Sequence, residues 1–227
     1  MAERPVFVPS EQVPFVREVP VTFKWHPGMS RAQAQRSITE LHSAAGEHGI
    51  GPVLEISSKS ATRLGVDLSA FNLTFTAPDG RRVSVESAYQ GSKVFAGDAG
   101  PYHDLYGKPS RDAKLDERVH GRSDIVAFDF YGQRWPAKPI TAFYDWLYLY
   151  ALRRNPALAG EVSQYAGFTD IAFNPQKSVA CQARCAAMYV ALKRQGRTGD
   201  ILDEQQSFLE LMELQVKRTA PVQESLF

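Results

Sequence analysis

The strand-like segments of this chain are short and widely spaced, and segments with a helical period separate them. A short apolar run bounded by Gly, Pro or Asp indicates one strand, whereas apolar residues three and four apart indicate one face of a helix. The strand-like runs are 19–25, 53–57, 73–77, 81–83 and 125–130. The helical patterns are 30–48, 84–95, 143–150, 156–167, 178–195 and a last stretch capped by Asp200. Few strands among several helices predict an α+β fold: a mainly helical single domain with a small β-sheet.

Length and composition are consistent with one soluble domain. The chain has 227 residues, of which 44% are hydrophobic and 22% charged, so it can bury a sizeable core. Its formal net charge of +1 predicts no general attraction to nucleic acid or to a membrane surface. No apolar run approaches the roughly 18 residues of a membrane span, and the N-terminus lacks the pattern of a signal peptide. The two cysteines are too few for a disulfide scaffold, and we expect a reducing, cytoplasmic setting.

Three regions are expected along the chain. Residues 1–52 form an N-terminal arm, irregular up to residue 18, then a strand and a helix packed on the core. Residues 53–216 form the main domain, and residues 217–227 form a flexible tail. Within the main domain, residues 96–122 are rich in Gly, Pro and charge and predict a long loop. This loop carries the densest basic stretch, which is either a solvated surface or a nucleic-acid contact: Arg111, Lys114, Arg118 and Arg122.

The helix predicted after the Pro78-Asp79-Gly80 turn carries the most distinctive polar pattern. Ser84 can cap it, and Glu86 then lies in the first turn, where the helix dipole stabilises an ionised carboxylate. Positions i, i+4 and i+7 place Glu86, Gln90 and Lys93 on one face. From the spacing alone, an ordinary amphipathic helix with a solvated stripe accounts for the pattern.

Other common site patterns are absent from the sequence. The five histidines and two cysteines show no metal-ligand spacing, so we expect no metal, and Cys181 and Cys185 are interpreted as small helix-packing residues. There is no dinucleotide-binding glycine motif, phosphate-binding loop or serine nucleophile elbow. Trp135 follows a strand and can belong either to the core or to a site.

Glu86, Gln90 and Lys93 match the Glu-x-x-x-Gln-x-x-Lys signature of NADAR domains, and other residues extend this resemblance. The turn Ser69-Ala70-Phe71-Asn72 resembles the family's Ser-Asn-Phe turn. Lys59, Trp135 and Asp170 with Phe173 fall, in that order, where the family carries a lysine, a tryptophan and an Asp-x-x-Trp pair. The resemblance runs from about residue 53 to residue 195 and implies the NADAR fold, with residues 53–216 as its catalytic domain.

The sequence also departs from the family pattern. Cys181 and Arg184 occupy the register of the family's Gly-x-Asn-x-Leu-Gly, and Phe173 replaces a tryptophan. The N-terminal segment of roughly 50 residues lies outside the common pattern. These traits resemble the NADAR branch that accompanies DarT-type toxins, which ADP-ribosylate guanine in DNA.

The resemblance implies an ADP-ribosyl glycohydrolase that removes ADP-ribose from guanine in single-stranded DNA, as antitoxin to a DarT-type toxin and without a cofactor. Two alternatives stay open. One is an N-glycosidase of riboflavin-pathway intermediates, as in the YbiA-like branch. The other is a non-catalytic antitoxin that binds ADP-ribose or the toxin. The oligomeric state is not predicted.

The resemblance also assigns roles to residues. Glu86 is the catalytic carboxylate, which stabilises an oxocarbenium-like sugar or moves its proton. Lys59 either forms an imine with the opened sugar or binds phosphate and ribose oxygens. Asp170 is a possible second carboxylate. The expected substrate-binding residues are Ser69, Asn72, Gln90, Lys93, Trp135 and Asp170.

Overall fold

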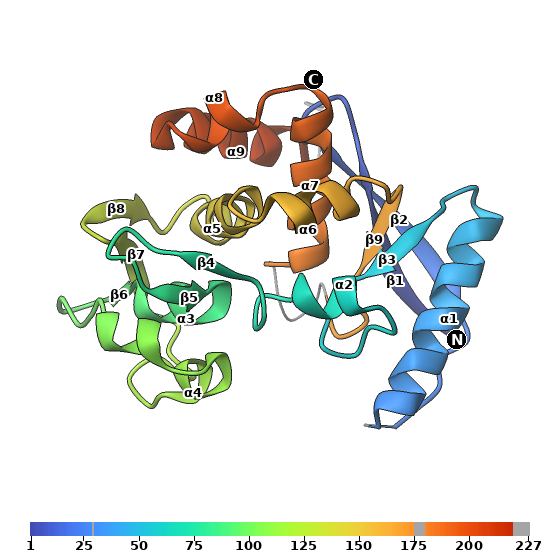
Figure 1. Ribbon diagram of the computed structural model, residues 1–227, viewed down its shortest axis with the longest axis horizontal. Coiled ribbons are helices and arrows are strands. Elements are labelled where there is room, and N and C mark those ends of the chain that lie inside the picture. The colour runs from blue at the N-terminus through green and yellow to red at the C-terminus, as the bar shows by residue number, and fades with distance from the viewer. Residues whose placement is uncertain (29, 175–179, 220–227) are drawn as a thin grey trace, which may run out of the picture.

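The computed structural model describes residues 1–28, 30–174 and 180–219 and shows an α+β fold, as predicted (Figure 1). Its strands are β1 (Ala2–Pro9), β2 (Val16–Phe23), β3 (Val53–Glu55), β4 (Thr74–Thr76), β5 (Arg82–Ser84), β6 (Lys93–Phe95), β7 (Ile125–Phe130), β8 (Gln133–Pro136) and β9 (Gly167–Thr169). Its α-helices are α1 (Arg31–Glu47), α2 (Arg63–Asp67), α3 (Val85–Gly91), α4 (Ser110–Leu115), α5 (Ala142–Arg153), α6 (Pro156–Val162), α7 (Gln182–Arg194), α8 (Thr198–Leu202) and α9 (Gln205–Thr219), and η1 (His103–Gly107) is a 3-10 helix. Within these ranges no helix is both long and apolar enough to cross a membrane.

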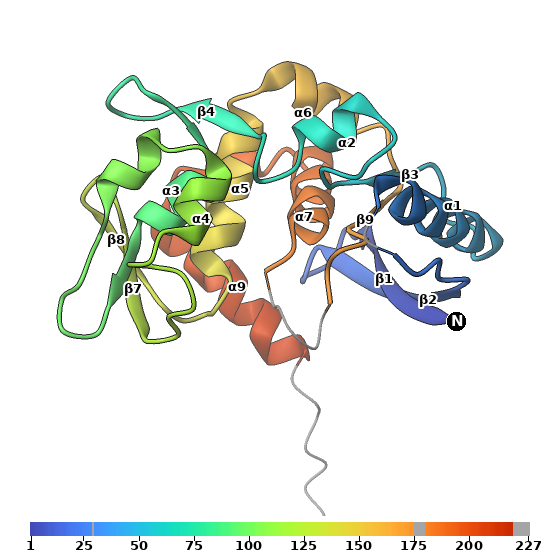
Figure 2. The same ribbon diagram turned by 90° about the horizontal axis from the view of Figure 1, so that it is seen from below.

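The strands form three small sheets. One has the order β2-β1-β9-β3, in which β3 and β9 run parallel and the other neighbours antiparallel. The others are the β4-β5 hairpin and the antiparallel sheet β6-β7-β8. Two helices, α5 and α7, lie between the four-stranded sheet and the β6-β7-β8 sheet (Figure 2). Both are buried on nearly all sides, as expected for the central helices of a domain.

The N-terminal arm was wrongly predicted to be irregular up to residue 18. β1 pairs with β2 along its whole length, from Ala2 opposite Phe23 to Pro9 opposite Val16. The prolines had argued against a strand, because proline donates no backbone hydrogen bond. In the observed register Pro5 lies opposite Pro20, so two of them share one rung of the ladder. Of the capping box predicted for the next helix, the N-cap is confirmed, since the Ser30 hydroxyl accepts a hydrogen bond from the Gln33 N–H. The reciprocal bond is absent, because the Gln33 side-chain oxygen has no hydrogen-bond partner among the described residues.

The helix predicted for residues 84–95 is shorter than expected. Ser84 caps it by accepting a hydrogen bond from the Ser87 N–H, but α3 ends at Gly91, and Lys93 begins β6. Gly91 lets η1 pack closely, since a Cβ there would lie 2.6 Å from the Tyr106 ring. Lys93 therefore reaches Gln90 from a strand and not from the same helix face.

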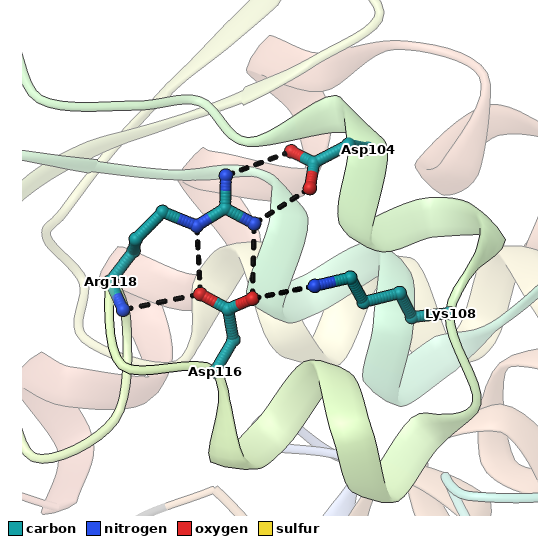
Figure 3. A network of polar contacts seen from close by, with 4 residues as sticks. All are labelled: Asp104, Lys108, Asp116 and Arg118. Carbon is teal, nitrogen blue, oxygen red and sulfur yellow. Dashed lines mark hydrogen bonds and ion pairs between the residues drawn. The ribbon is translucent and has the colours of Figure 1, made fainter.

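The long loop predicted for residues 96–122 contains η1 and α4, and a cluster of charges stabilises it. The Arg118 guanidinium contacts the carboxylates of Asp104 and Asp116, and Lys108 donates to Asp116 at 2.8 Å (Figure 3). Arg122 pairs with Asp124 in the same way. Two of the four basic residues predicted to face solvent or DNA are thus neutralised by nearby carboxylates.

The C-terminal half departs from the predicted element boundaries. Gly167 begins β9 instead of ending a helix, and Asp200 lies inside α8 instead of capping the last helix. The predicted helix start at Ser178 and loop end at Pro175 lie outside the described residues. α9 continues to Thr219, beyond the residue where a frayed tail was expected to begin.

Candidate active site

A cleft of about 370 Å3 lies where four segments distant in sequence meet. Its walls are the loop after β3, the turn at residues 69–72, the first turn of α3 and the loop after β9, with α4 and the start of α7 at its edge. The polar residues that line it are Ser57, Ser58, Ser69, Glu86, Lys114, Tyr144, Asp170, Asn174 and Gln182. Of the predicted site residues, the cleft thus brings together Ser69, Glu86 and Asp170.

Glu86 is a buried carboxylate in the wall of this cleft, with 5% of its surface exposed. Its backbone N–H donates to the Ala70 carbonyl at 2.9 Å, which joins α3 to the turn at residues 69–72. Its Oε1 accepts a 2.9 Å hydrogen bond from Gln90 Nε2 and lies 3.7 Å from Lys114 Nζ. The amide N–H of Gln90 therefore fixes the direction of the Glu86 carboxylate, and the Lys114 ammonium lies beside it.

Gln90 and Lys93 support Glu86 from behind and do not line the cleft. Lys93 Nζ donates to Gln90 Oε1 at 2.6 Å, so the NH2 group of that amide must face Glu86. Burial lowers the pKa of Lys93 to about 8, against the opposing effect of the Glu86 charge. Both were predicted to bind substrate, but their contacts make them positioning residues for Glu86.

Ser69 and Asn72 hold the turn in shape with the same groups that were expected to bind ribose. Ser69 Oγ donates to the Val66 carbonyl at 2.8 Å and accepts from Asn72 Nδ2 at 3.0 Å. Asn72 Nδ2 also donates to Val66, and the side chain is not part of the cleft lining. Of these two residues, only Ser69 therefore lines the cleft and can contact a ligand there.

Trp135 does not reach the cleft. Its ring is fully buried and contacts Phe143, Trp146 and Phe208, which belong to α5 and α9. Since β8 turns this side chain into the core, the structure contradicts the expected role in substrate binding. A tryptophan after a strand is equally consistent with the core and with a site, so its position in the sequence did not discriminate between the two.

Lys59 lies in the loop after β3, half-buried and beside the cleft. Its backbone N–H donates to Ser57 Oγ at 3.2 Å, and its carbonyl accepts from Gln35 of α1 at 3.4 Å. Ser57 and Ser58 line the cleft, whereas the Lys59 side chain is not among the lining residues. Burial raises the pKa of Asp170, and the charge of Lys59 opposes that rise. The Lys59 ammonium therefore favours the ionised form of Asp170, which lines the cleft.

Several cleft residues were not recognised from the sequence, and Gln182 and Lys114 make the most informative contacts among them. Gln182, at the start of α7, accepts from the Ala70 N–H at 2.7 Å and donates to the Ile56 carbonyl at 2.7 Å and to Asp170 Oδ2 at 3.0 Å. One amide thus ties three walls of the cleft together. Lys114 was assigned to a basic loop, but its Nζ lies over the Phe71 ring at 5.1 Å and beside Glu86. No local pattern marks either role, because all their partners are distant in sequence.

Cys181 and Arg184, which occupy a register of the family pattern, are structural. Arg184 donates to the buried Asp145 at 2.9 Å and to Gln215 at 2.6 Å, and Cys181 is buried. Cys185 donates to the same carboxylate at 3.0 Å.

Among the described residues, no three His, Cys, Asp or Glu side chains are arranged to hold a metal ion.

The chain is similar to a known protein family. A family model described as DarT1-associated NADAR antitoxin covers residues 2–221. None of the curated proteins matches the chain.

Proposed function

The chain belongs to the family of DarT1-associated NADAR antitoxins, and we propose that it removes ADP-ribose from guanine bases of single-stranded DNA. In this reaction water replaces guanine at C1″ of the distal ribose. The C1″–N bond breaks, its electron pair goes to the exocyclic nitrogen of guanine, and that nitrogen takes a proton. The product pair is free ADP-ribose and unmodified guanine in the DNA.

The observation that best supports this proposal is the fixed, buried carboxylate of Glu86 in the cleft wall. Loss of the base places positive charge on the sugar ring, and a nearby carboxylate that is already oriented stabilises that charge without reorganisation. Gln90 fixes the direction of Glu86, and Lys93 fixes Gln90. A carboxylate fixed in this way favours catalysis over binding alone, because it can act on the charge that develops at the sugar.

Lys114 adds a second element to the proposal. Its ammonium lies between Glu86 and the ring of Phe71 at the exposed edge of the cleft. There it can exchange the Glu86 contact for an anionic group of an incoming substrate, such as a phosphate. This exchange leaves Glu86 free to face the sugar once the substrate is in place.

Guanine-ADP-ribosylated single-stranded DNA is the substrate that tests this function. We expect the purified protein to release free ADP-ribose and to restore guanine, as measured by mass spectrometry of both products. Tight binding without release would identify a reader of ADP-ribose. Absence of both binding and release, together with cleavage of riboflavin-pathway intermediates, would assign the chain to the alternative glycosidase activity.

Two lysines near the cleft can be tested for covalent chemistry. If an amine forms an imine with the aldehyde at C1″ of the opened sugar, borohydride added during turnover should reduce it and attach ADP-ribose to that lysine. We expect the adduct on Lys59, whose loop forms the cleft wall beside Asp170. Lys59→Arg should then be nearly inactive, and the matched variant Lys114→Arg should keep most activity.

Peptide mapping decides between the outcomes. An adduct on Lys114 would transfer the nucleophilic role to that residue. Normal turnover by Lys59→Arg with no trapped adduct would leave Lys59 as a phosphate or ribose ligand, with Glu86 acting on the closed ring.

A further inference from the structure

Tyr144 is a cleft residue that the proposed reaction does not yet use. It lies in the first turn of α5, which runs beside α3 (Figure 2), and it lines the same cleft as Glu86. Its ring packs edge-on against Tyr89 of α3, with 5.2 Å between the ring centroids and 87° between the ring planes. The central helix α5 thus brings a phenol to the cleft that holds the proposed catalytic carboxylate.

The hydroxyl of Tyr144 is a free hydrogen-bonding group inside this cleft. In the part of the chain that the structure describes, it has no hydrogen-bond partner. It is also not one of the unpartnered side-chain polar atoms that are sealed from solvent. Because only 8% of the Tyr144 surface is exposed and the residue lines the cleft, its oxygen opens into the cleft.

The next tyrosine on the same face of α5 shows a different use of a buried phenol. Tyr148 Oη donates to the Leu68 carbonyl at 2.8 Å, so its hydroxyl holds two segments of the fold together. Tyr144 has no such bond, and a phenylalanine would make the same ring contact with Tyr89. Packing therefore explains the ring of Tyr144 but not its oxygen, and a largely buried hydroxyl without a partner indicates a group that awaits a ligand.

The Tyr144 hydroxyl is a neutral donor. Burial raises the pKa of Tyr144 well above its ordinary value, and the neighbouring Cys185 and Glu86 raise it further. Glu86 accepts its hydrogen bond from Gln90, and no hydrogen bond joins it to Tyr144 among the described residues. The phenol proton is thus retained near neutral pH and is available to a ligand in the cleft.

The reaction creates one group that needs such a donor. As the C1″–N bond breaks, the sugar becomes positive, and the electron pair left on the exocyclic nitrogen spreads into the adjacent ring nitrogens of guanine. A carboxylate stabilises the positive sugar, whereas an O–H group stabilises negative charge. A donor bound to the sugar ring oxygen would oppose the positive charge, so the leaving base is the partner that the Tyr144 hydroxyl suits.

We propose that Tyr144 is a catalytic residue, whose hydroxyl donates a hydrogen bond to a ring nitrogen of guanine as the base leaves. This role rests on the proposed function. The phenol keeps its proton, so the bonds that form and break remain those of the hydrolysis itself. Glu86 and Tyr144 then act on the opposite charges that develop on the two sides of one breaking bond.

Tyr144→Phe removes the hydroxyl and keeps the ring. Its kcat on guanine-ADP-ribosylated single-stranded DNA should fall by about a hundredfold, because a donor aimed at developing charge is lost. Its affinity for ADP-ribose, which carries no base, should stay within about threefold, as measured by calorimetry. Tyr150→Phe, on the same helix but outside the cleft lining, is the matched control and should change neither value. A parallel loss of ADP-ribose affinity, or an unchanged kcat, would overturn the proposal.

Thermal denaturation separates this role from a structural one. Tyr144→Phe should keep the melting temperature of the wild type, because its hydroxyl has no partner to lose. Tyr148→Phe should lower the melting temperature by about 2–4 °C, since it leaves the Leu68 carbonyl without its donor. An equal drop in both variants would make Tyr144 a structural residue and refute the catalytic role.

A binding experiment decides the contact without turnover. Carbon-13 NMR of tyrosine labelled at Cζ, in Glu86→Gln protein and assigned with Tyr144→Phe, should show the Tyr144 signal shift with the modified DNA and little with ADP-ribose. This shift without ADP-ribose release by the wild type would count against the proposed function and keep the contact. Release without the shift would refute the contact and keep the function, and absence of both would refute both.

Discussion

Glu86→Gln should lower kcat by about a thousandfold or more and leave ADP-ribose affinity within about threefold. The amide has the size of the carboxylate and can still accept the Gln90 hydrogen bond, so α3 and its contacts should persist. It carries no negative charge, however, and cannot stabilise an oxocarbenium-like sugar or take a proton. Single-turnover rates on modified DNA, with calorimetry of ADP-ribose binding, measure the two effects separately.

A nearby acidic residue provides the control for this variant. Glu117 lies just after α4 and is exposed, so Glu117→Gln changes the net charge by the same amount without touching the cleft. Its rate should equal that of the wild type. Near wild-type turnover by Glu86→Gln would refute the assignment of Glu86 as the catalytic carboxylate.

Asp145→Ala should lower the free energy of unfolding by about 3–5 kcal/mol. Asp145 of α5 is fully buried and accepts hydrogen bonds from Arg184 at 2.9 Å and from Cys185 at 3.0 Å, both in α7. Removing the carboxylate leaves the Arg184 guanidinium without its buried anionic partner between the two central helices. Urea denaturation of the wild type and the variant measures the difference.

A surface ion pair gives the contrast for this experiment. Asp203 pairs with Arg153 but is largely exposed, so Asp203→Ala should cost about 1 kcal/mol or less. Equal effects of the two substitutions would mean that the α5–α7 ion pair contributes no more than a solvent-screened one.

Features encoded by neighbouring residues could be predicted from the sequence. Ser30 caps α1, Ser84 caps α3, and the turn at residues 78–80 joins β4 to β5, because caps and turns depend on residues two to four positions apart. The i, i+4 spacing of Glu86 and Gln90 likewise placed their side chains in contact. The α+β class followed from the same short-range periods.

The contacts between distant segments were decided only by the tertiary structure. The pairing of β1 with β2 depends on a partner strand, and its prolines concealed it locally. Trp135 entered the core because β8 faces α5 and α9.

The same holds for the cleft residues that no local pattern revealed. Gln182 and Lys114 reached the cleft because α7 and α4 fold against α3 and the turn at residues 69–72. Glu55 contacts Thr169 only because β3 and β9, more than a hundred residues apart in sequence, lie side by side. The burial of a side chain and the charge around it depend on every residue that lies near it in space. The order of residues along the chain alone therefore does not determine them.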